Sequence, residues 1–155
     1  MTKTAKGFHI PPPVIYAVGV FIGWLLDRWQ PVPITPAGST GRMIGAAMCF
    51  VFFTAIVGTA FISFRRANTT VIPGRPANAL VTSGPYRITR NPMYVSFVLL
   101  YIGVTLWLNT WWPALVLPLV ILVIDRAVIR NEERYLASAF PDEYAEYRAN
   151  VRRWV

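Results

Sequence analysis

The sequence predicts an all-α integral membrane protein that forms a single membrane-embedded domain over residues 1–155, with four transmembrane helices. Of the 155 residues, 55% are hydrophobic and 14% are charged, whereas a soluble domain has about 25% charged residues. Residues 43–64 contain no charged side chain, and such a run is long enough to cross a hydrocarbon core about 30 Å thick. The formal net charge of +8 fits the enrichment of Lys and Arg in cytoplasmic segments, so we expect no nucleic-acid partner.

The first half of the chain predicts two spans joined by a loop. An apolar run follows three prolines and ends at a polar, aromatic sequence typical of a membrane interface, so we place the first span at residues 12–29. The loop that follows is rich in proline and glycine, and the second span covers residues 43–64. Small residues allow close helix approach in a bilayer. Three glycines are candidates for such contacts: Gly41, Gly45 and Gly58.

The second half predicts a helical hairpin that extends beyond the membrane. The connection over residues 65–91 has 27 residues, a length that indicates a functional segment, and its prolines at 73–76 indicate an ordered, turning path. The third span covers residues 93–108 and the fourth residues 112–130, with a tight polar turn between them. Because no terminator follows the fourth apolar run, we expect its helix to continue to about Ala137 and its last turns to project into the cytosol.

The distribution of basic residues predicts the orientation. Thirteen of the fifteen Lys and Arg residues lie in segments 1–13, 65–92 and 125–155. Because cytoplasmic segments carry the excess of Lys and Arg, both termini are expected in the cytoplasm. We therefore predict a multi-pass integral protein of a prokaryotic cytoplasmic membrane. This topology places two polar motifs, residues 84–94 and 132–147, in the same compartment.

The first motif, residues 84–94, is basic and rich in turn residues, and it leads directly into the third span. Asn91 is a good N-cap, and Pro92 is tolerated at the first helical position. Arg87 and Arg90 therefore lie at the positive end of a helix, where anions bind readily. The alternative is a basic loop that only obeys the topology rule, with its tyrosines anchored at the interface.

The second motif combines two adjacent carboxylates with a short helix. Glu132 and Glu133 point about 100° apart on a helix, so at most one of them faces a given pocket squarely. Beyond residue 140, Tyr144 and Tyr147 fall on one face of the next predicted helix, together with Val151. The alternatives are a solvated acidic face and an amphipathic tail that lies on the bilayer surface.

Together the two motifs resemble the isoprenylcysteine carboxyl methyltransferase family, which shares a superfamily with phospholipid N-methyltransferases. The family pattern is Gly-x-Tyr-x-x-x-Arg-His-Pro-x-Tyr, then a helical hairpin, then Glu-Glu-x-x-Leu-x-x-x-Phe-x-x-Glu-Tyr-x-x-Tyr. The match covers about half of the chain, residues 80–151, at the family's spacing. One position departs from it: Asn91 stands where the pattern has His, and an amide cannot take a proton near neutral pH.

The resemblance implies an enzyme that transfers a methyl group from S-adenosyl-L-methionine to a lipophilic acceptor. In this interpretation Glu132 or Glu133 binds the amino group of the donor, and Arg90 or the N–H groups after Pro92 bind its carboxylate. Arg90 and Glu133 are the candidate catalytic residues, and no metal site is expected. The candidate cofactor-binding residues are Tyr86, Arg87, Arg90, Asn91, Pro92, Tyr94, Glu132, Glu133, Tyr144 and Tyr147.

The acceptor is expected to enter between helices from the bilayer, and the carboxylate of an isoprenoid- or lipid-like molecule is favoured because two arginines can hold it. A phospholipid amine is the alternative acceptor. Two other classes stay open, a relative of the nicotinamide-dependent sterol reductases and a non-catalytic membrane scaffold. His9, the only histidine, is either a solvated tail residue or a base. The oligomeric state is left open.

Overall fold

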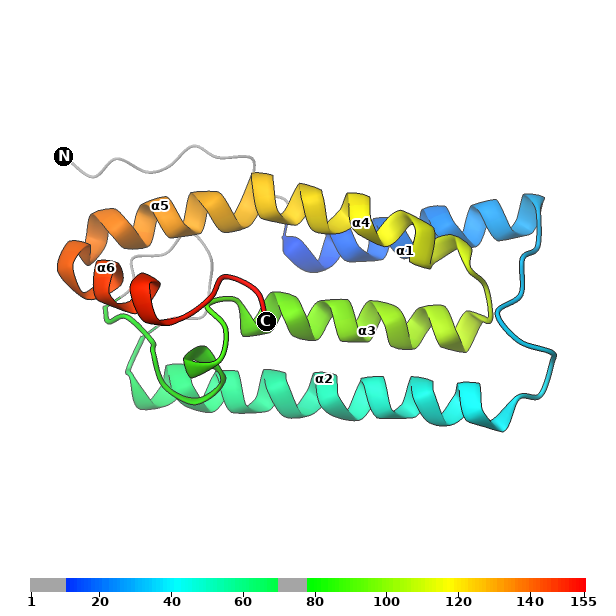
Figure 1. Ribbon diagram of the computed structural model, residues 1–155, viewed down its shortest axis with the longest axis horizontal. Coiled ribbons are helices and arrows are strands. Elements are labelled where there is room, and N and C mark those ends of the chain that lie inside the picture. The colour runs from blue at the N-terminus through cyan, green and yellow to red at the C-terminus, as the bar shows by residue number, and fades with distance from the viewer. Residues whose placement is uncertain (1–10, 70–77) are drawn as a thin grey trace.

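The computed structural model describes residues 11–69 and 78–155, and this part of the chain is helical (Figure 1). The first half holds α1 (Pro12–Trp29) and α2 (Thr40–Arg66). A short 3₁₀ turn, η1 (Gly84–Arg87), precedes α3 (Pro92–Leu108) and α4 (Trp112–Ile124). The C-terminal part holds the π turn η2 (Asp125–Ile129), α5 (Arg130–Ala139) and α6 (Pro141–Asn150). The predicted all-α class is confirmed for the described residues, which form no sheet.

Two of the described helices are long and apolar enough to cross a membrane. One is α2, with 27 residues, and the other is the continuous helix Trp112–Ala139, with 28 residues, formed by α4, η2 and α5. The helix α3 is apolar but shorter, and α1 coincides with the first predicted span. The predicted continuation of the fourth helix past Asp125 is therefore correct, and it ends two residues beyond the expected Ala137.

The helix boundaries follow from proline and asparagine at the chain reversals. Pro92 occupies the first turn of α3, as predicted, where its missing N–H has no intrahelical partner to lose. Asn109 ends the same helix with φ 56° and ψ 45°, a left-handed conformation that asparagine tolerates better than most residues. Its side-chain amide donates to the carbonyl of Thr35 at 3.0 Å, which fastens the hairpin turn to the loop between α1 and α2.

The helices pack as two pairs, α2 along α3 and α1 along α4 (Figure 1). A Cβ atom added at Gly23 would lie 2.6 Å from the backbone of Pro113, and one at Gly103 would lie 2.7 Å from Phe50. The prediction that Gly41 and Gly58 mediate close approach is wrong, because a Cβ atom there would meet no described atom within 4 Å. The glycines that the packing requires are on α1 and α3, where a bulkier residue would push neighbouring helices apart.

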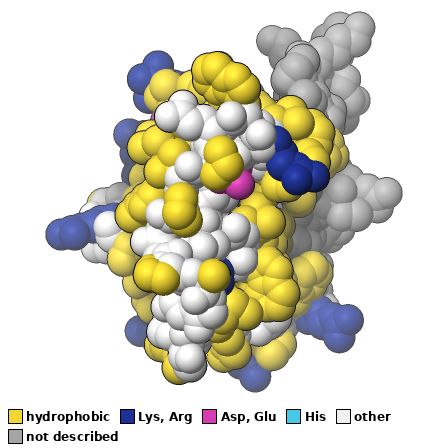
Figure 2. All heavy atoms as spheres, turned by 90° about the vertical axis from the view of Figure 1, so that its right-hand side faces the viewer, with side chains coloured by type: hydrophobic (Ala, Val, Ile, Leu, Met, Phe, Trp, Pro, Cys, Tyr) yellow, Lys and Arg dark blue, Asp and Glu magenta, His cyan; other side chains and the backbone are white. Residues whose placement is uncertain are grey.

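The end of the molecule that holds the hairpin turn shows mainly hydrophobic side chains, together with backbone and uncharged polar side chains (Figure 2). Trp107 and Trp111 are exposed there, as expected for an aromatic belt. Arg42 donates to the carbonyls of Leu106 and Trp107, so its charge is held against the end of α3. The opposite end holds η1, α5 and α6 and is called the motif end below (Figure 1).

The glycine contacts give a direct test of the packing. Gly23→Ala should destabilise the protein by about 1–3 kcal/mol, because the added methyl group overpacks the contact between α1 and α4. Gly58→Ala is the matched control and should be neutral or slightly stabilising, since alanine favours helices and the site is open. Thermal unfolding in one detergent measures both variants. Equal transition temperatures for the two would contradict this packing.

Candidate functional site

The two polar motifs meet at the motif end. Gly84 opens η1 with φ +62°, and a Cβ atom there would lie 2.4 Å from the hydroxyl of Ser63 on α2, so the turn requires glycine for both reasons. The segment that follows pairs with the C-terminal residues: the backbone N–H of Arg90 donates to the carbonyl of Arg152 at 2.9 Å. The start of α3 is thereby fixed against residues 151–155, which are called the C-terminal arm below.

Arg90 and Glu133 form the ion pair at the centre of the site. Their side chains are 3.3 Å apart at the closest nitrogen and oxygen and are only 10% and 14% exposed. The same Nη1 of Arg90 donates to the hydroxyl of Tyr144 at 3.4 Å. Its Nε is buried and finds no hydrogen-bond acceptor among the described residues. A buried donor without an acceptor is costly, so Arg90 keeps one unsatisfied donor in the described structure.

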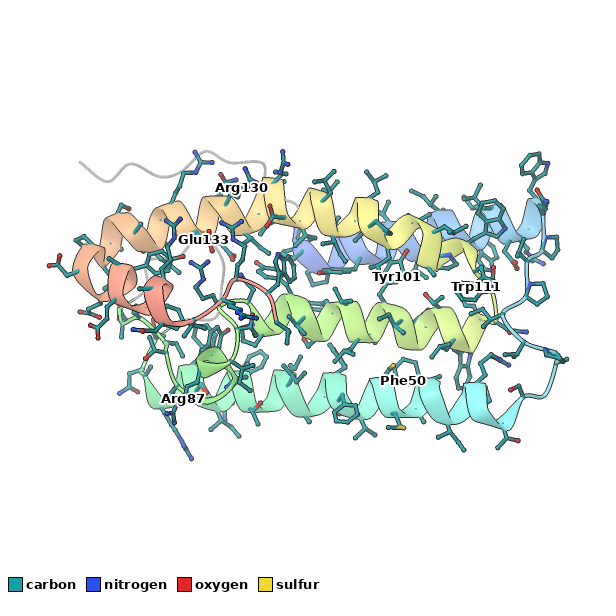
Figure 3. All side chains as sticks on the ribbon, in the orientation of Figure 1. Phe50, Arg87, Tyr101, Trp111, Arg130 and Glu133 are labelled. Atoms are coloured by element: carbon teal, nitrogen blue, oxygen red, sulfur yellow. The ribbon has the colours of Figure 1, made fainter. Side chains whose placement is uncertain are left out.

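Glu133 also binds a second arginine from the C-terminal arm. Arg153 donates to Glu133 from Nε at 3.1 Å and from Nη2 at 2.6 Å, and its Nη1 lies 3.4 Å from Asp125. The hydrogen bond to Glu133 is the main cause that raises the pKa of Arg153. Figure 3 shows Glu133 pointing from α5 into the motif end. The carboxylate of Glu133 is therefore shared between two guanidinium groups.

Glu132 has a different environment from its neighbour. Both of its carboxylate oxygens accept from the hydroxyl of Tyr94 at 2.8 Å. Burial raises the pKa of Glu132 to about 6, and the hydrogen bond from Tyr94 opposes this shift. The expected divergence of the two glutamates is confirmed. The alternative of a solvated acidic face is wrong, because each carboxylate is held by partners inside the motif end.

The tyrosines of the second motif attach α6 to the first motif. Tyr144 and Tyr147 are both buried, and the hydroxyl of Tyr147 donates to the carbonyl of Tyr86 at 2.7 Å. The ring of Tyr86 packs edge-on against Phe64 of α2. The alternative of a tail lying on a bilayer surface is wrong, since α6 packs on the rest of the protein through the face that carries Tyr144 and Tyr147.

Two predicted residues, Arg87 and Asn91, lie differently from expectation. Arg87 is exposed and points away from Glu133, so the structure does not bring it to the cluster (Figure 3). Asn91 precedes α3, but its side chain makes no capping hydrogen bond to the described backbone; it donates instead to the carbonyl of Arg153 at 3.0 Å. This contact uses the amide nitrogen of Asn91, whereas a cap would use its amide oxygen. His9 and the prolines of residues 73–76 lie outside the described residues.

Two cavities adjoin these residues. A cleft of about 560 Å³ opens beside Glu133 and Tyr144, and its other lining residues are Arg130, Arg134, Ala137, Arg148 and Arg153. A second cavity of about 210 Å³ lies between α1 and α3 and is almost entirely apolar. Tyr16 lines this second cavity, and its hydroxyl donates to the backbone carbonyl of Tyr94 at 3.2 Å. A hydrogen bond therefore connects the lining of the apolar cavity to Tyr94, the residue whose hydroxyl binds Glu132.

Sequence reasoning missed Arg153 and Asp125 as members of the site. The only signal in the sequence was the basic pair Arg152-Arg153. The enrichment of Lys and Arg in cytoplasmic segments already explained that pair. Within residues 11–69 and 78–155, no three His, Cys, Asp or Glu side chains lie close enough together to hold a metal ion.

A model of the phospholipid methyltransferase family matches residues 41–143, and the chain belongs to this family. It is 38% identical over 121 residues to the cobalt-zinc-cadmium resistance protein CzcN of Cupriavidus metallidurans, covering 78% of this chain and 50% of that protein. The nickel-cobalt-cadmium resistance protein NccN of Alcaligenes xylosoxydans xylosoxydans is 32% identical over 121 residues, which cover 77% of this chain and 51% of that protein. The chain thus spans about half the length of these two relatives.

A third relative carries the name of an enzyme. The protein-S-isoprenylcysteine O-methyltransferase of Schizosaccharomyces pombe is 38% identical over 72 residues, which is 46% of this chain and 30% of that protein. The resemblance inferred from the two motifs is therefore confirmed. No solved structure matches the chain.

Proposed function

We propose that this protein is an integral membrane methyltransferase that uses S-adenosyl-L-methionine to methylate a lipophilic acceptor. The observation that carries the proposal is the buried pair of Arg90 and Glu133 beside an open cleft. A cation and an anion held side by side match the ammonium and carboxylate groups of an amino acid. The cleft volume of about 560 Å³ is in the usual range for small-molecule sites. Membership of the phospholipid methyltransferase family supports the same reaction.

The donor site is assigned from the charges of the pair. Arg90 supplies a cation that fits a carboxylate of the ligand, and its buried Nε has no acceptor among the described residues. Glu133 fits the ammonium group, and Tyr144 lies next to the pair with an aromatic surface suited to a sulfonium. When bound, the donor supplies a methyl group activated by its positive sulfur. The chain's own contribution is to orient the reactants, which is worth roughly 7–11 kcal/mol in favourable cases.

The acceptor site is assigned to the apolar cavity between α1 and α3. Its lining is Pro13, Tyr16, Ala17, Val20, Phe97, Leu100, Tyr101 and Val104. Such a lining suits a hydrocarbon chain and offers little to a soluble substrate. The donor would then enter at the motif end, and the acceptor would enter from the bilayer.

We further propose four spans, at residues 12–29, 43–64, 93–108 and 112–130, with the motif end and both termini in the cytoplasm of a prokaryote. The basic residues Arg65 and Arg66 end α2 at the motif end, which also holds the arginines of the cleft, and this agrees with the rule for cytoplasmic segments. Among the relatives, CzcN and NccN come from bacteria.

Reporter fusions test this topology. Fusions at residues 36, 78 and 155 should report outside, inside and inside, because the loop before α2 lies at the opposite end of the bundle from the motif end. The fusion at residue 36 is the internal control for a reporter that fails to cross the membrane. A fusion at residue 155 that reports outside would contradict the arrangement, since the cleft would then face away from a cytosolic donor.

Glu133→Gln tests the donor site. We expect donor binding to weaken by about 1.5–3 kcal/mol, because a hydrogen-bonded charge pair is lost. Glu146→Gln is the matched control, since Glu146 is exposed on α6 and its loss changes the charge equally. Calorimetric titration of the solubilised protein with S-adenosyl-L-methionine measures both variants. Binding of NADPH instead would favour the reductase, and binding of neither would favour a scaffold.

The chemistry of the acceptor can be decided by the pH dependence of turnover. A carboxylate acceptor attacks in its ionised form and needs no base, so we expect turnover to stay flat from about pH 6 to pH 8. Arg90→Lys should lower turnover, because a point charge cannot replace the planar fork of arginine.

One observation favours a second candidate, a phospholipid amine. An amine must lose a proton before attack, and Glu132, with a pKa raised to about 6, is ionised above that pH and can accept it. On that alternative, turnover rises as the pH increases through about 6, and Glu132→Gln abolishes the rise. Such a profile, with methylation of phosphatidylethanolamine, would overturn the carboxylate assignment.

A further inference from the structure

Arg153 binds the carboxylate of Glu133, to which we also assign the ammonium group of the donor. Both oxygens of Glu133 accept from it, at 3.1 Å from Nε and 2.6 Å from Nη2. Oε1 of Glu133 also faces Arg90 at 3.3 Å. Two guanidinium groups therefore already neutralise one carboxylate, and a third cation at the same oxygens would meet repulsion from both.

The backbone of the C-terminal arm is fixed by contacts that do not involve this ion pair. The carbonyl of Arg153 accepts from the hydroxyl of Thr89 at 2.9 Å and from the amide of Asn91 at 3.0 Å. Trp154, the next residue, packs against the core cluster that contains Tyr16 and Tyr94. The arm is thus held in place by its main chain and by Trp154, so the guanidinium of Arg153 can move while the backbone stays bound.

A second carboxylate lies within reach of the same guanidinium. Nη1 of Arg153 is 3.4 Å from Asp125, and the Arg153 side chain is 30% exposed along the cleft. Asp125 lies 3.1 Å from Arg130 as well. Arg153 therefore has a close partner, Glu133, and a more distant one, Asp125. Asp125 could still bind the guanidinium after its contact with Glu133 is broken.

We propose that Arg153 competes with the ammonium group of the donor for Glu133, and that donor binding moves this guanidinium toward Asp125. This inference rests on the proposed function, because it takes the donor site to be at Arg90 and Glu133. In the free protein Arg153 satisfies Glu133, which would otherwise be a buried charge paired with Arg90 alone. The competition favours ligands that carry an amino-acid group, since an ammonium can replace the guanidinium at the carboxylate and an uncharged group cannot.

The test compares two nucleosides that differ in this group. S-adenosylhomocysteine carries the ammonium and carboxylate, whereas methylthioadenosine shares the adenosine and thioether but has neither. Arg153→Gln should tighten binding of S-adenosylhomocysteine about tenfold, the gain expected if the competent state is populated about one-tenth of the time. It should leave methylthioadenosine binding unchanged. Titrations of the solubilised 155-residue chain in detergent measure both.

Arg152→Gln is the matched control: it removes the same charge from the same arm, and its side chain is exposed, so neither affinity should change. Arg153→Lys is the second variant, in case the glutamine variant does not fold. A lysine cannot bind both oxygens in a fork, so we expect a smaller gain for S-adenosylhomocysteine.

Each other outcome has a defined meaning. Weaker binding of S-adenosylhomocysteine to Arg153→Gln would show that Arg153 positions Glu133 for the ligand, and unchanged binding would show that the two do not compete. Either result overturns the inference while leaving the proposed function intact. If the wild-type protein binds neither S-adenosyl-L-methionine nor S-adenosylhomocysteine, the proposed function itself is wrong, and the inference falls with it.

Discussion

The arrangement of the motif end depends on one constraint: Arg90 and Glu133 are charged, nearly buried and 3.3 Å apart. Neither could remain buried alone, because an unpaired charge loses its hydration without compensation. The pair therefore requires that the start of α3 and the face of α5 meet, although 43 positions separate the two residues along the chain. The packing of α6 through Tyr144 and the backbone contacts of the C-terminal arm enclose this pair.

The sequence predicted the helices and the two motifs well, because these depend on local patterns. Uncharged runs and prolines determined where the helices begin and end, and the period of Tyr144 and Tyr147 identified the buried face of α6. Contacts between distant segments were not predictable in the same way. The glycines at real helix crossings, Gly23 and Gly103, look no different in sequence from Gly58, which faces open space. Their role is decided only by which helices become neighbours.

The difficulty of predicting contacts between distant segments also explains which residues of the site were predicted and which were missed. The adjacent glutamates and Arg90 were found from their motifs, whereas the expected positions of Arg87 and Asn91 came from helix-capping rules that consider one helix at a time. In the folded chain the amide of Asn91 finds a carbonyl of the C-terminal arm, a partner 62 residues away. Arg153 reaches Glu133 for the same reason, and nothing near it in sequence indicates that contact.

The π turn at Asp125–Ile129 lies between the apolar helix α4 and the polar helix α5. A π turn holds one residue more than an α turn, so it changes the rotational phase of everything that follows by about 100°, the angle between consecutive side chains. Glu132 and Glu133 are consecutive. An α-helical turn in its place would therefore give one of the two carboxylates the direction that the other now has. The length of this turn, which ends three residues before Glu132, sets which glutamate faces Tyr94 and which faces Arg90.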